Sequence, residues 1–134
     1  MPETYHIATL NINGTTTPAK MEMLTDFLHR HAIDIIFLQE VTRPVFHDVR
    51  GFPAHINIGA HERGTAILTR DHIMLSDIEC LPTGRGMATN FEGITLVNIY
   101  APSGAERREG RLLCHCTPIS FAANPSVYTA WRRL

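Results

Sequence analysis

The chain has 134 residues, the size of one ordinary domain, and its composition of 44% hydrophobic and 19% charged residues is that of a globular protein. A formal net charge of −1 excludes a general attraction to nucleic acid or anionic membranes, so phosphate binding would need local groups or a metal ion. The start lacks a basic segment followed by an apolar one, and no apolar run approaches ~18 residues, which predicts an intracellular protein without a signal peptide or membrane span.

A strand and a helix are the first predicted elements. Residues 5–12 form an apolar, strand-like run that contains Asn11 and leads into Asn13. Thr17 followed by Pro18 is typical of a helix start, with the threonine as cap and the proline in the first turn. Apolar residues then recur at helical spacing up to about residue 30, at Met21, Leu24, Phe27 and Leu28. This stripe predicts a helix that packs on a sheet.

The run from Ile33 to Leu38 predicts a strand that is buried on both faces. Five of its six residues are apolar, and neither glycine nor proline interrupts it. It leads through a glutamine to Glu40, and a polar loop is expected from Val41 to Gly51. Strand, helix and strand form a βαβ unit whose parallel strands end at the same edge of the sheet. Asn11 and Glu40 are therefore expected at one rim.

The following part of the chain is expected to be mostly antiparallel β-structure. Short strand-like segments alternate with turn residues, and Glu92-Gly93 is typical of a hairpin link. The expected strands cover residues 52–58, 64–69, 72–81, 87–91 and 94–100. The last of these strands ends in Tyr100.

The chain changes character after about residue 108. Residues 110–134 contain neither aspartate nor glutamate, although 13 acidic residues occupy the positions before them. No helical or strand period is sustained there. We therefore expect a partial domain over residues 1–108 and a divergent tail over residues 109–134, which arises from a frameshift or truncation.

An amide, a carboxylate and a phenol each stand where a strand-like run ends. If the strands that carry Asn11, Glu40 and Tyr100 are neighbours, the three side chains meet at one rim, where α/β sheets collect ligand groups. Each residue alone has an ordinary explanation, as a turn former, a surface acid or a half-buried ring. The three together favour a functional site.

Three further polar residues lie beside this rim and are candidates for substrate contact. Asn13 and Ser103 are near the strand ends, although turn formation explains both equally well. Asn98 shares a strand face with Tyr100, so it is also a candidate for orienting the phenol.

Three segments in order, Leu10 to Gly14, Phe37 to Glu40 and Val97 to Pro102, resemble motifs of the endonuclease/exonuclease/phosphatase (DNase I-like) superfamily. Within it the chain most resembles the apurinic-type endonuclease domain of LINE-type non-LTR retrotransposons, and Arg63 to Leu68 is similar to the strand between the second and third motifs. The resemblance covers about residues 5–108. It implies an α/β (α+β) fold, the N-terminal half of a four-layer α/β/β/α sandwich with mixed sheets.

The resemblance also implies metal-dependent hydrolysis of a phosphodiester and a role for each rim residue. Glu40 matches the metal-binding glutamate, Asn11 the asparagine beside metal and scissile phosphate, and Tyr100 the tyrosine that hydrogen-bonds the phosphate. Mg²⁺ is the implied cofactor, with Mn²⁺ as a substitute, because hard oxygen ligands suit both ions. The implied partner is the backbone of DNA, and the implied compartment is the nucleus.

The sequence departs from the family in its later part. A Gly-Asp-x-Asn motif and a Ser-Asp-His ending are expected there, yet no aspartate follows Asp77 and His115 has no acidic neighbour. We therefore expect a fragment of a DNA-nicking enzyme that has little or no activity alone. Two alternatives stay open: a non-catalytic remnant or binding module, and a phosphatase of the same superfamily that acts on inositol lipids or nucleotides.

Overall fold

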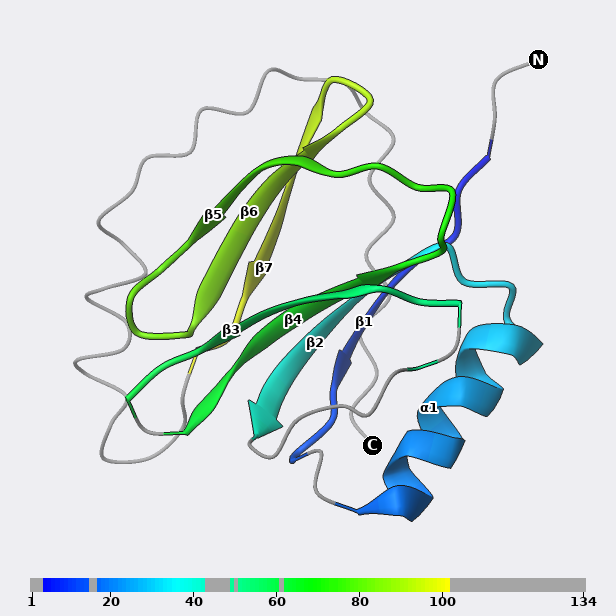
Figure 1. Ribbon diagram of the computed structural model, residues 1–134, viewed down its shortest axis with the longest axis horizontal. Helices are drawn as coiled ribbons and strands as arrows, with labels where there is room; N and C mark the ends of the chain where they lie inside the picture. The colour runs from blue at the N-terminus through cyan, green and yellow to red at the C-terminus, as the bar shows by residue number, and fades with distance from the viewer. Residues whose placement is uncertain (1–3, 15–16, 43–48, 50, 61, 102–134) are drawn as a thin grey trace.

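The computed structural model describes residues 4–14, 17–42, 49, 51–60 and 62–101. Within them the chain forms one helix and seven strands (Figure 1). In chain order the elements are β1 (Ile7–Asn11), α1 (Pro18–Arg30), β2 (Ile35–Thr42), β3 (Ala54–Ile58), β4 (Arg63–Thr69), β5 (Ser76–Cys80), β6 (Gly86–Phe91) and β7 (Ile94–Ile99). The strands expected from the sequence are all present, with ends shifted by a few residues.

The strands form two sheets that face each other. The first has the order β1-β2-β4-β3, in which β1 and β2 are parallel and the other pairs are antiparallel. The second has the order β5-β6-β7 and is antiparallel. Helix α1 covers the outer face of the first sheet (Figure 1). The expected mixed α/β fold with two sheets is therefore confirmed.

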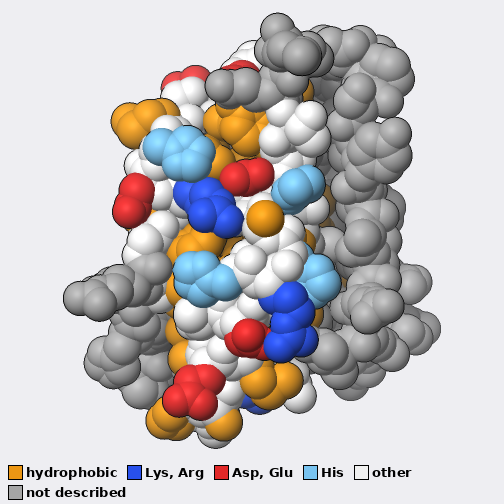
Figure 2. Space-filling model, turned by 90° about the vertical axis from the view of Figure 1, so that its right-hand side faces the viewer, with side chains coloured by type: hydrophobic (Ala, Val, Ile, Leu, Met, Phe, Trp, Pro, Cys, Tyr) orange, Lys and Arg blue, Asp and Glu red, His pale blue; other side chains and the backbone are white. Residues whose placement is uncertain are grey.

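The face that carries α1 is chemically mixed. Basic, acidic and histidine side chains are interspersed over it with small apolar areas between them (Figure 2). Within the described part of the chain, no helix has the length and apolar character needed to cross a bilayer. Attraction of an anionic partner to this face would therefore depend on individual groups, as the net charge of −1 suggests.

The start of α1 follows the sequence prediction in position but not in every contact. Thr17 is the N-cap residue with extended backbone and Pro18 stands in the first turn, yet the threonine side chain makes no capping hydrogen bond. The fixed φ of Pro18, rather than a side-chain cap, therefore favours the helix start at this position. At the other end, the N–H of His31 donates to the Phe27 carbonyl at 3.1 Å and closes the last turn.

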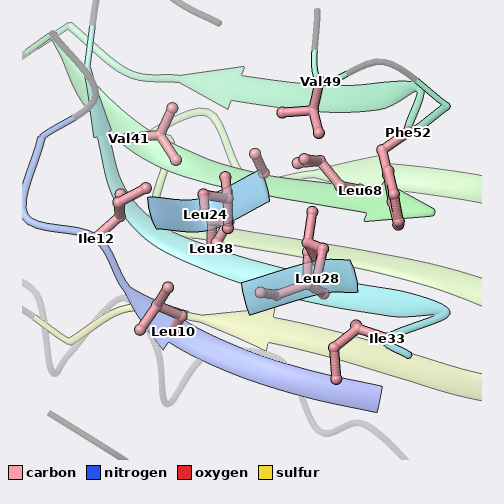
Figure 3. Packing of buried hydrophobic residues seen from close by; sticks show 12 residues of the cluster. Leu10, Ile12, Leu24, Leu28, Ile33, Leu38, Val41, Val49, Phe52 and Leu68 are labelled. Atoms are coloured by element: carbon pink, nitrogen blue, oxygen red, sulfur yellow. The ribbon is translucent and has the colours of Figure 1, made fainter. Parts of the chain in front are cut away.

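The first sheet has a hydrophobic core on each of its faces. Leu24 and Leu28 of α1 pack on Leu38 and its neighbours on the outer face (Figure 3), and Ile35 belongs to the core between the sheets. Ile35, Ile36 and Leu38 are all completely buried, which confirms that β2 is covered on both sides. Because β2 lies between β1 and β4, whatever stands at its end is held by strands on both sides.

A β-bulge interrupts the pairing of β2 with β4 at Glu40. Gln39 stands opposite Thr65 but Val41 opposite Gly64, so Glu40 is the extra residue, with a left-handed φ of 56°. Simple alternation would put Glu40 on the helix side with Leu38, whereas the bulge gives that side to the buried Val41. The bulge thereby turns the Glu40 side chain towards the second sheet.

The polar loop predicted from Val41 to Gly51 begins later than expected, because β2 continues past the bulge. β2 continues to Thr42, because Val41 and Thr42 still pair with the start of β4. Gly64 stands opposite Val41, and it is the neighbouring β3 that requires glycine there, because a Cβ would lie 1.8 Å from the carbonyl oxygen of Asn57. Residues 43–48 of the expected loop lie outside the described residues.

Candidate functional site

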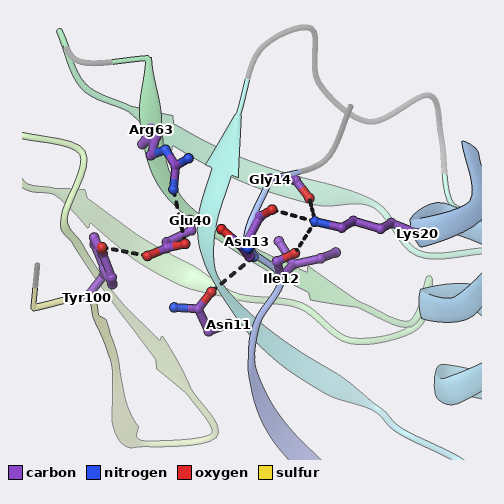
Figure 4. A network of polar contacts seen from close by, with 8 residues as sticks. All are labelled: Asn11, Ile12, Asn13, Gly14, Lys20, Glu40, Arg63 and Tyr100. Carbon is purple, nitrogen blue, oxygen red and sulfur yellow. Dashed lines mark hydrogen bonds and ion pairs between the residues drawn. The ribbon is translucent and has the colours of Figure 1, made fainter. Parts of the chain in front are cut away.

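The Glu40 carboxylate is the centre of a polar cluster at the end of β2 (Figure 4). The Tyr100 hydroxyl donates to its Oε1 at 2.6 Å, and Nη1 of Arg63 donates to its Oε2 at 3.1 Å. The Glu40 side chain is 15% exposed, and that of Arg63 is 51% exposed. The carboxylate thus has one partly buried partner, Tyr100, and one half-exposed partner, Arg63.

Tyr100 comes to Glu40 from the second sheet. It directly follows β7, and its N–H donates to the Arg85 carbonyl beside the start of β6 at 2.9 Å. The expectation that the three motif strands are neighbours is therefore wrong for β7, which pairs with β6. The carboxylate and the phenol meet nonetheless, because the bulge aims Glu40 across the gap between the two sheets.

The pKa of Tyr100 is raised to about 12, first because the ring is partly buried and then because the hydroxyl is bonded to the negatively charged Glu40. The positive charges of Arg63 and Arg85 oppose this shift. The phenol therefore keeps its proton at physiological pH, and it serves the site as a hydrogen-bond donor rather than as a base.

Asn11 ends β1, the parallel neighbour of β2, and stands in register with Gln39. Its Oδ1 accepts a hydrogen bond of 3.0 Å from the N–H of Asn13, which is exposed and has a left-handed φ of 49°. Asn11 and Glu40 therefore lie at the same end of two parallel strands, as expected. The side chain of Asn11 also shapes the turn that follows it.

Lys20 of α1 stabilises the turn after Asn11 by hydrogen bonds. Its ammonium donates to the carbonyl oxygens of Ile12 at 3.1 Å, of Gly14 at 3.3 Å, and of Asn13. The N–H groups of Ile12 and Gly14 in turn donate to the carbonyls of Gln39 and Glu40, at 3.0 and 2.8 Å. The backbone around Asn11 is thus fastened to the helix on one side and to the bulge on the other.

A buried pair of amides holds the two sheets together beneath the cluster. Asn98 of β7 is 2% exposed, and its Nδ2 donates to the carbonyls of Leu38 and Ala66 at 3.0 and 2.9 Å. Its Oδ1 accepts from Nε2 of Gln39 at 2.9 Å, and the same Nε2 donates to Thr9. Asn98 and Gln39 each precede a cluster residue, Tyr100 by two positions and Glu40 by one.

Asn98 is therefore wrongly placed among the residues expected to contact substrate. Its amide is enclosed between the sheets and fully used by protein partners, so its contribution is to position β7. Asn13 is exposed beside the cluster, and its contact with substrate stays a prediction. Ser103 and the tail over residues 109–134 lie outside the described residues.

Comparison with known protein families shows to which family the chain belongs. The sequence profile of the endonuclease/exonuclease/phosphatase family matches residues 8–134, which is most of the chain. The chain belongs to the endonuclease/exonuclease/phosphatase family. No curated protein matches the chain.

Solved structures show that this family member has the fold of an AP endonuclease and of TDP2 proteins. An AP endonuclease from Archaeoglobus fulgidus is 22% identical with a TM-score of 0.60, over 74% of this chain and 42% of its own. Truncated TDP2 from Caenorhabditis elegans is 19% identical with a TM-score of 0.59, over 78% and 49%. TDP2 from D. rerio, solved with a single-strand DNA product, is 18% identical with a TM-score of 0.58, over 80% and 50%. At these identities the likeness shows the fold alone, and the chain spans at most about half the length of each.

The described cluster of this family member offers oxygen donors, the kind of ligand that a hard divalent cation takes. Within the ranges that the structure describes, histidine, cysteine, aspartate and glutamate nowhere gather in threes to hold a metal. Mg²⁺ needs no such cage, because it keeps several waters and binds one or two carboxylates together with substrate phosphate. Glu40 offers that carboxylate, and Asn11 offers an amide oxygen from the neighbouring strand.

Sequence reasoning missed Gln39, Arg63 and Lys20 as parts of the site. Gln39 had a usable signal, since a carboxamide in an otherwise apolar, buried strand must find partners. Lys20 had none and Arg63 had only its place in a stretch similar to the family, because arginine and lysine are common on surfaces.

Proposed function

We propose that Glu40, Asn11 and Tyr100 form the metal-binding and phosphate-binding part of a phosphodiesterase centre that, in a complete enzyme, nicks DNA. The hydrogen bond of 2.6 Å between Tyr100 and Glu40 carries the proposal, because it joins two sheets at a bulged residue with φ of 56°. A left-handed conformation is costly for glutamate, and such strain is typical of functional positions. The same carboxylate would serve equally well on the surface if it were needed only for solubility.

Each residue has a task that its surroundings support. Glu40 presents carboxylate oxygens, Asn11 presents an amide at the adjacent strand end, and Tyr100 presents a hydroxyl whose raised pKa keeps it a donor to a phosphate oxygen. A bound Mg²⁺ would neutralise charge that develops on the phosphoryl group. The described residues hold and orient a phosphodiester but offer no base beside Glu40 to activate water, since the groups bonded to its carboxylate are Tyr100 and Arg63.

The choice of DNA rests on the motif forms and on structural relatives. Asn-Ile-Asn-Gly after the first strand and Tyr-Ala-Pro-Ser after the last favour the retrotransposon-type endonucleases over the phosphatases of the superfamily. The AP endonuclease and the DNA-bound TDP2 among the structural relatives support the same class of substrate. We therefore propose a LINE-type endonuclease whose remaining catalytic groups are not among the described residues.

Binding of Mn²⁺, followed by electron paramagnetic resonance, tests the metal site directly. We expect one site in the 134-residue chain whose affinity falls at least ~10-fold in Glu40→Gln, because the amide lacks the negative charge that holds the ion. Glu92→Gln is the matched control, since Glu92 also accepts a tyrosine hydroxyl, that of Tyr5 at 2.9 Å, but lies in the turn at the other end of β7. Equal Mn²⁺ affinity in the Glu40 variant and the wild-type chain would overturn the proposal.

Nicking of supercoiled plasmid tests the inactivity expected of this chain. With Mg²⁺ present, wild-type chain and Glu40→Gln should both stay at the background rate. Metal-dependent nicking by the wild-type chain that disappears in Glu40→Gln would overturn that expectation while supporting DNA as the substrate. Hydrolysis of an inositol phosphate or a nucleotide instead of DNA would favour the phosphatase alternative.

A further inference from the structure

Arg63 holds Glu40 by a single, partly exposed contact. Only Nη1 bonds the carboxylate, at 3.1 Å, and half of the arginine side chain is open to solvent. A guanidinium carries five N–H donors, so this hydrogen bond leaves most of the fork available. In the described part of the chain it is the one hydrogen bond that the Arg63 side chain makes.

The backbones on both sides of this contact are fixed, whereas the arginine side chain is not. Arg63 begins β4 in register with Thr42, and the next residue, Gly64, packs too closely on β3 to admit a Cβ. Glu40 is held by the bulge. The Arg63 guanidinium therefore stays beside the carboxylate but can turn about its own side-chain bonds, as an exposed arginine does.

A divalent cation on Glu40 would change the partner of Arg63. The guanidinium and the cation would compete for the same carboxylate oxygens and would repel each other. The negative group that replaces the carboxylate as partner would be the phosphate that Tyr100 also contacts.

We propose that Arg63 is a phosphodiester-binding residue that pairs with Glu40 in the metal-free protein and with a phosphate oxygen when the metal is bound. The proposal rests on the proposed function and deepens it, because it assigns a second donor to the substrate phosphate. Arg63 and Tyr100 approach the two oxygens of the Glu40 carboxylate separately, so their donors would reach a bound phosphate from different directions. A planar, forked guanidinium suits the oxygens of a phosphodiester.

Mn²⁺ affinity tests whether Arg63 opposes a cation at Glu40. Arg63→Gln should bind Mn²⁺ roughly threefold to fivefold more tightly than the wild-type chain, because an exposed ion pair and a repulsion are removed. Arg63→Lys keeps the positive charge and should stay near the wild-type affinity. Arg30→Gln, which breaks the exposed pair of Arg30 with Asp26 on α1, is the matched control and should change nothing.

DNA binding in the presence of Mn²⁺ tests the phosphate contact. For a short duplex oligonucleotide, Arg63→Gln should weaken binding about threefold to tenfold. The negative slope of log affinity against log salt should become less steep by about 0.9, the value for the loss of one phosphate contact. Arg63→Lys should keep the salt slope, and Arg30→Gln should match the wild-type chain. Circular dichroism and thermal unfolding of each variant establish that it folds.

The outcomes separate this proposal from the one on which it rests. Loss of Mn²⁺ affinity in Glu40→Gln with no gain in Arg63→Gln would overturn the competition and leave the metal site standing. Tighter Mn²⁺ binding in Arg63→Gln with unchanged DNA binding, or failure of the wild-type chain to bind DNA with Mn²⁺, would overturn the phosphate contact. Unchanged Mn²⁺ affinity in Glu40→Gln would overturn the proposed function itself.

Discussion

Strand β2 has an acid paired with an arginine at each end, and the two pairs are built differently. Asp34 precedes the strand and bonds Nε of Arg70 at 3.2 Å, whereas Glu40 near its other end bonds Arg63 at 3.1 Å. The two carboxylates are equally enclosed, with 17% and 15% of the side chains exposed. Burial and pairing alone therefore do not distinguish Glu40 from Asp34.

The partners of Asp34 belong largely to the backbone. The N–H of His6 donates to its Oδ2 at 2.8 Å, and its own carbonyl accepts the N–H of Arg70 at 3.0 Å. The Arg70 guanidinium also donates to the Ile33 carbonyl at 3.0 Å and lies 5.5 Å from the centre of the Phe52 ring. These contacts join β1, β2 and the end of β4, and none of them can yield without disturbing the sheet.

The partners of Glu40 are two side chains, a phenol and an arginine that is half exposed. Both can turn to another ligand while the backbone stays in place. On the proposed function Glu40 is the acid that takes a ligand, and its partners, unlike those of Asp34, are replaceable while its backbone is held independently. At Glu40 the bulge and the Gln39–Asn98 pair supply that independent support.

The largest expected effect tests the support beneath Glu40. Asn98→Leu should lower the free energy of unfolding by about 3 kcal/mol, because the carbonyls of Leu38 and Ala66 and the amide of Gln39 would lose a buried partner. Urea unfolding measures the change. Asn90→Leu, in the same sheet but bonded at the surface to Asp77 and Thr95, should cost less than about 1 kcal/mol. Equal losses in the two variants would contradict the supporting role of Asn98.

The next effect sets the two acids directly against each other. Asp34→Ala should lower the free energy of unfolding by roughly 2 kcal/mol, since it leaves the His6 N–H without its acceptor and removes the carboxylate that pairs with the Arg70 guanidinium. Glu40→Ala should cost less than about 1 kcal/mol, because its lost partners can turn to water. Chemical unfolding of both variants under one condition makes the measurement. A greater loss at Glu40 than at Asp34 would reverse the distinction between them.

The left-handed backbone at Glu40 predicts that the glycine and alanine variants have opposite orders of stability at Glu40 and at Glu79. Glu40→Gly should be more stable than Glu40→Ala by roughly 1 kcal/mol, because only glycine adopts a φ of 56° without cost. In the exposed strand residue Glu79, glycine should be less stable than alanine by about 0.5 to 1 kcal/mol. Thermal unfolding of the four variants provides the values. The same order at both positions would show that Glu40 carries no strain.

The smallest expected effect is on the dependence of stability on pH. The pKa of Tyr100 is about 12 in the folded chain against 10.0 for an ordinary tyrosine, so the contribution of its hydroxyl is complete below pH 10 and is lost as pH rises through 12. The stability difference between the wild-type chain and Tyr100→Phe should therefore shrink over this range. Phenolate absorbance follows the same titration, and Glu40→Gln should lower the pKa without restoring the ordinary value, because the effect of burial remains. A constant stability difference would contradict the raised pKa.

Local patterns predicted much of this architecture. The apolar run that became β2, the helical stripe of α1 and the short strands after Pro53 were all recognisable, because a buried strand and an amphipathic helix impose their periods on the sequence. The motif residues Asn11 and Glu40 were placed correctly at one edge, because parallel strands of a βαβ unit end together. Bulges and inter-sheet partners have no such local period, so the roles of Gln39 and Arg63 and the burial of Asn98 between the sheets were not predicted.

The sequence by itself therefore determined which segments are strands and helix, and that a carboxylate and an amide share an edge. Only the tertiary structure decided that Tyr100 reaches Glu40 from the other sheet, 60 positions along the chain, and that Asn98 is buried. The physical reason is the separation in sequence over which each kind of interaction acts. Strand and helix patterns act over a few neighbouring residues, whereas the aim of Glu40 depends on a bulge formed against β4 and on how the second sheet packs over β2.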